Sequence, residues 1–432
     1  MLYSGIICAP VDRFCSICAV RCFKHIAKDH TMKKVYIRSN GCIDNLLDGK
    51  SYKQYFAENG WEIVQNPADA DLILANTCAF DKQHEDTSVS DIEELKKFKN
   101  AQLVVTGCLP KINQERLNQI FDGISFGPKE REKIKDIIGS DKEVKWKDQH
   151  TIDDDDITEL PHRKVVHQVA KIKNKAGRFG KYILPNFEIG EVTGDQDAFF
   201  LVLGEGCLSN CSYCAIKKAK GGLTSKPLAE IVEDFKRGLA QGYKRFILTA
   251  DDTGAYGQDI KTDLPTLIEK LLEVNGDYRL NIYHLEPNWL IKYFDYFLKV
   301  FDTDKIDVIF APMQSGSNRI LKAMRRPYTA EDYIACIKAL REKLPSLKIW
   351  NQFIVGFPGE TDEDHADSMK VLDQINFNVV QAFEYSDRPG TAASKMENKT
   401  PPDVMKKRLK QIRRKILLKV NLKKLKPIGR AS

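Results

Sequence analysis

Residues 199–214, FFLVLGEGCLSNCSYC, join a run of five apolar residues to a Gly-Glu-Gly turn and three closely spaced cysteines. The apolar run predicts a buried strand that ends at the first glycine. Cys207, Cys211 and Cys214 follow with three and two residues between them, which suits a loop wrapped around an iron–sulfur cluster. Three thiolates leave one iron of a [4Fe-4S] cluster open to chelate another molecule. Zinc fits less well, because a structural zinc site needs a fourth protein ligand and none lies nearby.

Strand-like and helix-like segments alternate from this stretch to about residue 395 and predict an α/β fold. Apolar runs typical of strands occur at 199–203, 245–248, 280–282, 308–311, 349–355 and 379–383. Six strands in about 200 residues, with helices between them, indicate a partial (β/α) barrel.

A smaller block of the same kind comes first and predicts an open parallel sheet. Strands are expected from residue 33, at 72–74 and at 103–105, and helices at 47–59 and near 92–98. Cys42, Cys78 and Cys108 each follow one of these strands after small or polar residues. Because parallel strands end at one edge of their sheet, the three thiols are predicted to converge there and to hold a second cluster. The alternative is three buried cysteines that serve as small apolar side chains.

The blocks divide the chain into five segments. We expect a cysteine-rich extension over residues 1–31, an open-sheet domain with the second cluster over 32–140, a linker over 141–195, the barrel over 196–400 and a basic helical tail over 401–432. The linker is poor in apolar residues and contains four consecutive aspartates at 153–156.

The tail accounts for the positive charge of the whole chain. It holds 12 Lys and Arg and no acidic residue from Lys406 to Ser432, so the net charge of +7 leaves 7 − 12 = −5 for the rest. Apolar residues recur at three- and four-residue steps from Met405 to Val420, which predicts a basic amphipathic helix. Two interpretations stay open: a helix docked on the body with a solvated basic face, or a contact for an RNA backbone or another polyanion.

Cysteine usage and hydropathy favour a cytoplasmic protein. The chain has 11 cysteines, no export signal and no apolar run of the roughly 20 residues that span a membrane. Cys336 lies in a helical stretch and is expected to pack in the core. The remaining four cysteines lie near the N-terminus: Cys8, Cys15, Cys18 and Cys22. They could bind zinc, but Met32 stands just before the first strand, so we expect an accessory segment or a start upstream of the native one.

The cysteine spacing at 207–214, with Tyr213 beside the last cysteine, resembles the radical S-adenosylmethionine (SAM) signature. Together with the second cysteine triad, the chain resembles the methylthiotransferase family from residue 32 to about residue 414. The matching segments are NGCIDN at 40–45, NTC at 76–78, TGC at 106–108, PMQSGS at 312–317, GFPGET at 356–361 and YSDRPGT at 385–391. Residues 248–260, LTADDTGAYGQDI, look most like the archaeal and eukaryotic branch, which acts on threonylcarbamoyl-adenosine in tRNA.

The resemblance implies two [4Fe-4S] clusters, with SAM as both radical source and methyl donor. The cluster on Cys207, Cys211 and Cys214 would cleave SAM to methionine and a 5′-deoxyadenosyl radical, and the second cluster would supply the sulfur. The residues implied to contact SAM are Tyr213, Asp252, Gln314, Ser315, Gly316 and Gly356. The implied partners are tRNA and an electron donor such as flavodoxin or ferredoxin, for a monomer that does not contact membranes.

Four features depart from the family pattern. The sequence offers the basic helix in place of the family's C-terminal RNA-binding β-barrel, the TRAM domain. Lys220-Gly221 replaces the usual Arg-Gly, Phe310 and Ala311 stand where a His is common, and Gln352 replaces a common Asp. The substrates that stay open besides tRNA are a ribosomal protein, a peptide or a small metabolite. An alternative from another functional class is an iron–sulfur RNA-binding or regulatory protein.

Overall fold

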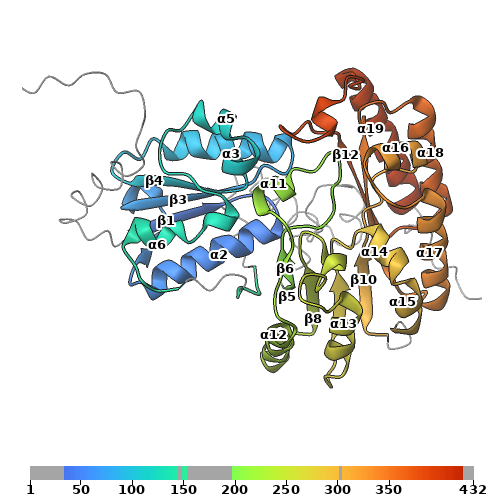
Figure 1. The fold of residues 1–432 in the computed structure, drawn as a ribbon, viewed down its shortest axis with the longest axis horizontal. Helices are drawn as coiled ribbons and strands as arrows, with labels where there is room; N and C mark the ends of the chain where they lie inside the picture. Colours follow the sequence, from blue (N-terminus) through green and yellow to red (C-terminus); the bar gives the residue numbers. More distant parts are fainter. Residues whose placement is uncertain (1–33, 144–147, 153–196, 301–303, 422–432) are drawn as a thin grey trace, which may run out of the picture.

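The computed structural model describes residues 34–143, 148–152, 197–300 and 304–421. It contains two parallel sheets, one from each predicted block (Figure 1). The first sheet has the order β2-β1-β3-β4, with β1 at Lys34–Ser39, β2 at Glu62–Ile63, β3 at Leu72–Thr77 and β4 at Gln102–Gly107. Its central strands are buried on both faces, which explains their continuous apolar runs. The two-residue strand β2 is too short to leave a periodic signal in the sequence.

Five helices and two 3-10 turns surround the first sheet: α2 (Ile43–Glu58), α3 (Lys82–Leu95), α4 (Leu109–Ile112), α5 (Gln114–Asn118), α6 (Lys133–Ile138), η1 (Pro67–Asp69) and η2 (Pro128–Glu130). The predicted starts of the first two helices, at residue 47 and near residue 92, are wrong, because α2 begins at Ile43 and α3 at Lys82. The first turn of α3 is polar and so carries no apolar period, whereas Ile43, Leu46 and Leu47 of α2 do recur at helical spacing. In α3 the cap is a side chain, since the Asp81 carboxylate accepts the His84 N–H at 2.8 Å.

The second sheet has six parallel strands in the order β12-β11-β10-β9-β8-β5, and all six predicted strands are present. They are β5 (Ala198–Val202), β8 (Arg245–Thr249), β9 (Arg279–Ile282), β10 (Ile306–Phe310), β11 (Lys348–Val355) and β12 (Val379–Glu384). A short antiparallel pair, β6 (Gly204–Glu205) and β7 (Thr224–Ser225), lies beside them. The strand order runs without reversal from one edge to the other, so the predicted partial (β/α) barrel is confirmed.

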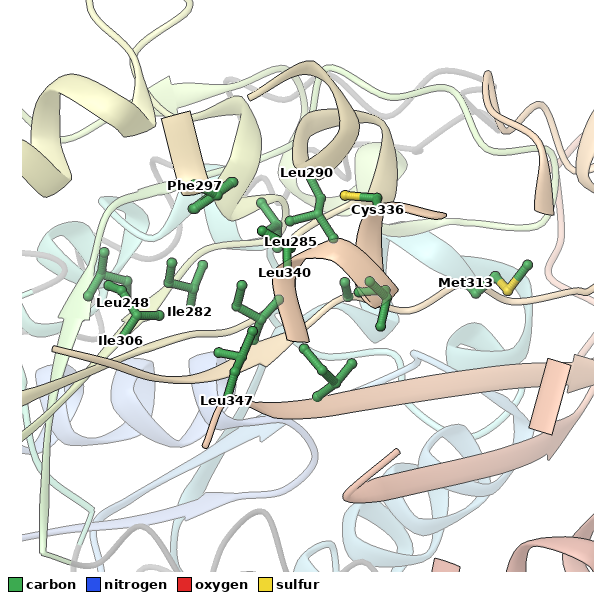
Figure 2. Close-up of a cluster of buried hydrophobic side chains, with 14 of the residues drawn as sticks. Leu248, Ile282, Leu285, Leu290, Phe297, Ile306, Met313, Cys336, Leu340 and Leu347 are labelled. Atoms are coloured by element: carbon green, nitrogen blue, oxygen red, sulfur yellow. The ribbon is translucent and has the colours of Figure 1, made fainter. Parts of the chain in front are cut away.

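The helices of this barrel are α11 (Ile216–Lys220), α12 (Leu228–Ala240), α13 (Leu264–Leu272), α14 (Pro287–Lys292), α15 (Phe294–Val300), α16 (Asn318–Ala323), α17 (Ala330–Lys343) and α18 (Asp362–Gln374), with the 3-10 turns η3 (Thr253–Ala255) and η5 (Ala393–Lys395). The longer helices cover the outer face of the sheet, where apolar side chains such as Leu248, Ile282 and Leu340 form one core (Figure 2). Cys336 of α17 lies in this core and is 5% exposed, as expected for a cysteine that packs as a small apolar residue.

The inner face of the barrel sheet is covered by a helix of the other block. Side chains at alternate positions of β5, such as Phe200 and Val202, point to this face and form a buried cluster with the inward residues of β8, β9 and β10. Ile43, Leu46 and Leu47 complete the cluster from the first two turns of α2. The first two turns of helix α2 therefore pack against the concave face of the barrel.

The segment predicted as a linker contributes to this packing where it is described. Ile152 is 4% exposed and joins the inner cluster, while the His150 ring stacks on Phe199 at 4.5 Å between centroids. The cysteine-rich segment over residues 1–31 and the four aspartates lie outside the described residues.

Buried ion pairs join the two blocks at other points. Arg388, which follows β12, pairs with Glu85 of α3 at 2.6 Å, and Arg131, which follows η2, pairs with Glu205 of β6 at 2.5 Å. All four side chains are 10% exposed or less. Glu85 also pairs with Arg116 at 2.5 Å, so the contact belongs to a larger network of charges that holds a fixed geometry.

The predicted basic helix is α19 (Pro402–Ile416), followed by a π-helical turn, η6 (Leu417–Asn421). Ile412 and Ile416 join the outer core, and Arg408 is buried against Glu360 and Asp362 at 2.9 and 2.8 Å. The helix is therefore docked on the body, as the first interpretation predicts, and Lys406, Lys407 and Lys410 are exposed, as contact with a polyanion requires. Among the described residues, the helices are too short or too polar for a membrane span.

The Arg388–Glu85 pair gives a test of how the blocks are joined. Replacing Arg388 with Met should lower the free energy of unfolding by roughly 1.5–3 kcal/mol in urea denaturation of the full chain, because Glu85 loses a buried charge-assisted hydrogen bond but keeps its pair with Arg116. The control Lys399→Met breaks the ion pair between Lys399 and Asp387, which are 36% and 52% exposed. It should lower the free energy of unfolding by about 1 kcal/mol or less. Equal losses in the two variants would contradict a stabilising role for the buried pair.

Candidate active site between the two sheets

The loop after β6 carries three cysteines, Cys207, Cys211 and Cys214, here called the loop triad. Gly206 precedes it with φ at 81°, and a Cβ there would come 2.1 Å from the carbonyl oxygen of Gly222, so only glycine fits. Ser212, in the middle of the loop, is anchored on both sides. Its N–H donates to the Met324 carbonyl at 3.0 Å, and its own carbonyl accepts the Ala393 N–H at 2.7 Å. The loop is thus fixed by α16 and η5 while its thiols stay partly exposed.

The thiols of the loop triad interact with one another. Burial, followed by the Asp252 carboxylate, raises the pKa of Cys207 to about 12, and burial, followed by Cys211, raises that of Cys214 to about 12. The Ser209 N–H donates to the Cys207 sulfur at 3.3 Å. Metal binding at such thiols displaces their protons, and the positive charge of the metal then balances the negative charge of the thiolates.

Cys42, Cys78 and Cys108, the edge triad, meet at the carboxyl edge of the first sheet. Cys42 caps α2, Cys78 follows β3 and Cys108 caps α4 after β4. The Cys78 thiol forms a hydrogen bond with Cys42, which lowers the pKa of Cys42 and raises that of Cys78. Gly41, at φ 101°, makes this approach possible, because a Cβ there would lie 2.3 Å from the Cys78 Cβ.

Neither triad is compact enough for a single metal ion. Within the described residues, the group of three possible ligands that all lie within 4.8 Å of one another is Asp148, His150 and Asp234. Asp234 in that group is already paired with Lys226 and Arg237, so it is satisfied without a metal. In a [4Fe-4S] cluster each thiolate binds a different iron, and the wider spacing of both triads fits that arrangement.

Each triad has one buried cation beside it. Lys220, the last residue of α11, lies 3.1 Å from Asp44 of α2 and 2.9 Å from Asp251, which follows β8. Burial alone would lower the pKa of Lys220, but Asp251 and Asp44 outweigh it and hold the pKa well above its usual value. Helix α11 lies between the two sheets (Figure 1), so this contact joins the blocks at the triads.

Arg326, which follows α16, is the cation beside the loop triad. It donates to Glu286 at 2.6 Å and to the Tyr213 hydroxyl at 2.6 Å. Tyr213 lies between two cysteines of the loop and is implied by the family resemblance, whereas Arg326 and Glu286 are far apart in sequence and carry no motif. Sequence reasoning therefore missed both.

Asp252 is a buried carboxylate, and one of its two oxygens accepts no hydrogen bond from the described residues. Its Oδ2 accepts the Trp289 indole N–H at 3.0 Å and the Ser209 hydroxyl at 3.4 Å, while its Oδ1 is buried with no hydrogen-bond partner among the described residues. Burial, followed by Glu286, raises its pKa to about 7. A buried acceptor beside Cys207 fits the amino group of a chelating amino acid such as the methionine part of SAM.

The four remaining predicted SAM residues have local structural roles. Gln314 has φ at 73° and joins β11, since its N–H donates to the Gln352 carbonyl at 2.9 Å and its carbonyl accepts from Ile354 at 2.9 Å. Ser315 Oγ accepts the Ser317 N–H at 3.2 Å.

The two glycines among these four pack against helices. Gly316 meets the backbone of Ser368 in α18, where a Cβ would lie 2.6 Å away, and Gly356, at φ 75°, is covered by Met405 of α19. These contacts account for glycine at both positions. No described contact joins Gly316 or Gly356 to the loop triad, so their part in SAM binding stays a prediction.

Comparisons with known proteins agree with this geometry. Residues 201–372 match the family described as Radical SAM superfamily, and residues 34–127 match uncharacterized protein family UPF0004. A probable threonylcarbamoyladenosine tRNA methylthiotransferase of Pyrococcus horikoshii is 31% identical over 91% of this chain and 86% of its own length. The threonylcarbamoyladenosine tRNA methylthiotransferase of Homo sapiens is 30% identical over 89% of this chain and 62% of its own. The radical SAM methyltransferase TsrM of Kitasatospora setae shares the fold, with a TM-score of 0.55, 13% identity, and coverage of 84% of this chain and 77% of that one.

The barrel and its cysteine loop are those of a radical SAM enzyme. Since relatives at about 30% identity match nearly the whole chain, the chain belongs to the radical SAM methylthiotransferase family. It is a SAM-dependent transferase of a sulfur-containing group, and its cofactors are SAM and two [4Fe-4S] clusters.

Iron content separates the two triads. After anaerobic reconstitution the chain should bind about eight irons, because each [4Fe-4S] cluster holds four. The two test variants replace with alanine either Cys207, Cys211 and Cys214 or Cys42, Cys78 and Cys108. Each should retain about four irons, and only the variant without the loop triad should lose SAM cleavage. The control Cys336→Ala, changed in the core, should keep about eight; about four irons in the unmodified chain would contradict a second cluster.

Proposed function

We propose that this enzyme adds a methylthio group to threonylcarbamoyl-adenosine in tRNA. The observation that carries the proposal is the likeness over most of the chain to proteins named for that activity in Pyrococcus horikoshii and Homo sapiens. Residues 252–257, which look like that branch, begin with Asp252 beside the loop triad. Gly254 lies against Trp289, where a Cβ would come within 2.4 Å, so this segment packs on the residue whose indole N–H donates to Asp252.

The two triads take different parts in this proposal. Cys207, Cys211 and Cys214 would hold the cluster that binds SAM, and the edge triad would hold the cluster that supplies sulfur. When bound, SAM and the clusters supply a carbon-centred radical and a methylthio group. Asp252 Oδ1 would accept a hydrogen bond from the amino group of SAM.

Two further groups would prepare the site. Arg326 would hold the side chain of Tyr213, and with it the cysteine loop, in place through the 2.6 Å hydrogen bond to the Tyr213 hydroxyl. Helix α2 would exclude water from the inner face of the barrel, since Ile43 and Leu46 are buried there.

The exposed basic side chains of α19 would contact the RNA backbone. Lys406, Lys407 and Lys410 are exposed, whereas Lys415 pairs with Asp373 and is held to the body. Each phosphate contact should add about −0.7 to −0.9 to the slope of log affinity against log salt. Flavodoxin or ferredoxin as electron donor and a monomeric state complete the proposal.

The substrate is tested by mass spectrometry of tRNA nucleosides from cells with and without the gene, and by reconstituted enzyme acting on tRNA that carries threonylcarbamoyl-adenosine. Both should give the methylthio nucleoside. The matched control is Cys42→Ala, which should still release 5′-deoxyadenosine but form no methylthio product, because Cys42 belongs to the edge triad alone.

Three results would contradict this proposal. An unchanged nucleoside profile, with methylthio groups found on a ribosomal protein or peptide instead, would assign another substrate to the same chemistry. Methylthio transfer by Cys42→Ala would remove the division of labour between the triads. Affinity for tRNA that is insensitive both to salt and to changing Lys406, Lys407 and Lys410 to Gln would exclude α19 from the interface.

A further inference from the structure

Lys220 lies between the two triads and is held by a carboxylate from each side. It ends α11, the helix that follows the loop triad, and its side chain is 4% exposed. Asp44 and Asp251, its two carboxylate partners, are 8% and 7% exposed. A buried ammonium of this kind is stable only while both partners hold it, so its position is fixed.

The two carboxylates belong to different centres. Asp44 lies in the first turn of α2, two residues after Cys42. Asp251 accepts the Gly206 N–H at 2.8 Å, and Gly206 directly precedes Cys207. The hydrogen bonds to Asp44 and Asp251 take two of the three N–H donors of the ammonium.

The charge of Lys220 acts on one triad more than on the other. Helix α11, which ends at Lys220, packs on α4, the helix that Cys108 caps, and Ala219 shares a buried cluster with Cys108. Arg326 lies instead at the loop triad, where it donates to the Tyr213 hydroxyl at 2.6 Å. Each triad is therefore served by its own buried cation.

Sulfur transfer requires the edge triad's centre to take up an electron. A substrate carbon radical brings one electron and a methylthio sulfur brings a lone pair of two. The new C–S bond holds two electrons, the bond between iron and that sulfur breaks, and the third electron reduces the iron–sulfur centre. A nearby positive charge favours the reduced form of such a centre.

We propose that Lys220 is a positioning residue that raises the reduction potential of the centre on the edge triad, so that this centre accepts the electron released when the C–S bond forms. Asp44 and Asp251 hold the ammonium in place for this purpose. The inference rests on the methylthiotransferase chemistry of the family and not on the identity of the substrate.

The test is an anaerobic redox titration followed by EPR on the full chain with both clusters reconstituted. The variants are Lys220→Met, which removes the charge, Lys220→Arg, which keeps it, and Asp44→Asn, which removes a negative charge from the same contact. The two triple-cysteine variants supply the spectra that assign each signal to its triad.

Lys220→Met should shift the reduction equilibrium of the edge-triad centre about tenfold toward the oxidised form, which is about 59 mV for one electron. The loop-triad centre should shift much less, and Lys220→Arg should restore the potential. Lys220→Met should also form about tenfold less methylthio product for each SAM cleaved, in line with the same equilibrium.

Asp44→Asn separates charge from packing. If charge is the cause, this variant raises the potential of the edge-triad centre, opposite to Lys220→Met. Shifts in the same direction for both variants, equal shifts at both centres, or an unchanged potential in Lys220→Met would overturn the proposal. If Lys220→Met loses iron, the decision falls to the other two variants: a rise in Asp44→Asn with no change in Lys220→Arg supports the proposal, and any other pair of results rejects it.

Discussion

The first two turns of α2 are buried in the concave face of the barrel, and most of the site depends on that contact. Ile43, Leu46 and Leu47 fill a cluster formed by the inward side chains of β5, β8, β9 and β10. A partial barrel of six strands leaves this face without helices of its own, so its apolar side chains need a partner from elsewhere in the chain. Because Cys42 caps the same helix, the apolar contact also carries the edge triad to the barrel.

Charge completes what the apolar contact begins. Burying thiols that must become thiolates is costly unless cations lie close by, and the structure supplies Lys220 for one triad and Arg326 for the other. Both cations are held by carboxylates that are themselves buried, at Asp44, Asp251 and Glu286. A network of this kind fixes geometry more than it adds stability, since removing one partner would leave another buried charge without full compensation.

Spacing and strand pattern made the cysteines and the six barrel strands predictable from sequence. Three cysteines at local spacing describe their own loop, and buried parallel strands appear as apolar runs. Ile43 and Leu46 lie at helical spacing, so the start of α2 could have been placed from sequence. The start of α3 at Lys82 was not predictable in the same way, because its first turn is polar and is fixed by the Asp81 cap. The same holds for Arg326 and Glu286, which meet only in the folded chain, 40 residues apart.

A motif residue can also have a structural role beside the one that the family resemblance implies. Gly316 and Gly356 belong to segments that match the family, yet their contacts with α18 and with Met405 already require glycine. Lys220 is the reverse case. The sequence shows it only as a departure from the family's usual Arg, and the structure places it between both triads.

The proximity of the two iron–sulfur centres is measured most directly by EPR of the protein with both clusters reduced. The contact of Lys220 with Asp44 and with Asp251 joins the neighbourhoods of Cys42 and Cys207, so the two centres should interact magnetically. The spectrum of the intact protein should then be broadened and differ from the sum of the spectra of the two triple-cysteine variants. A spectrum equal to that sum would mean that the centres lie too far apart to act on one substrate, and would contradict a single active site between the two sheets.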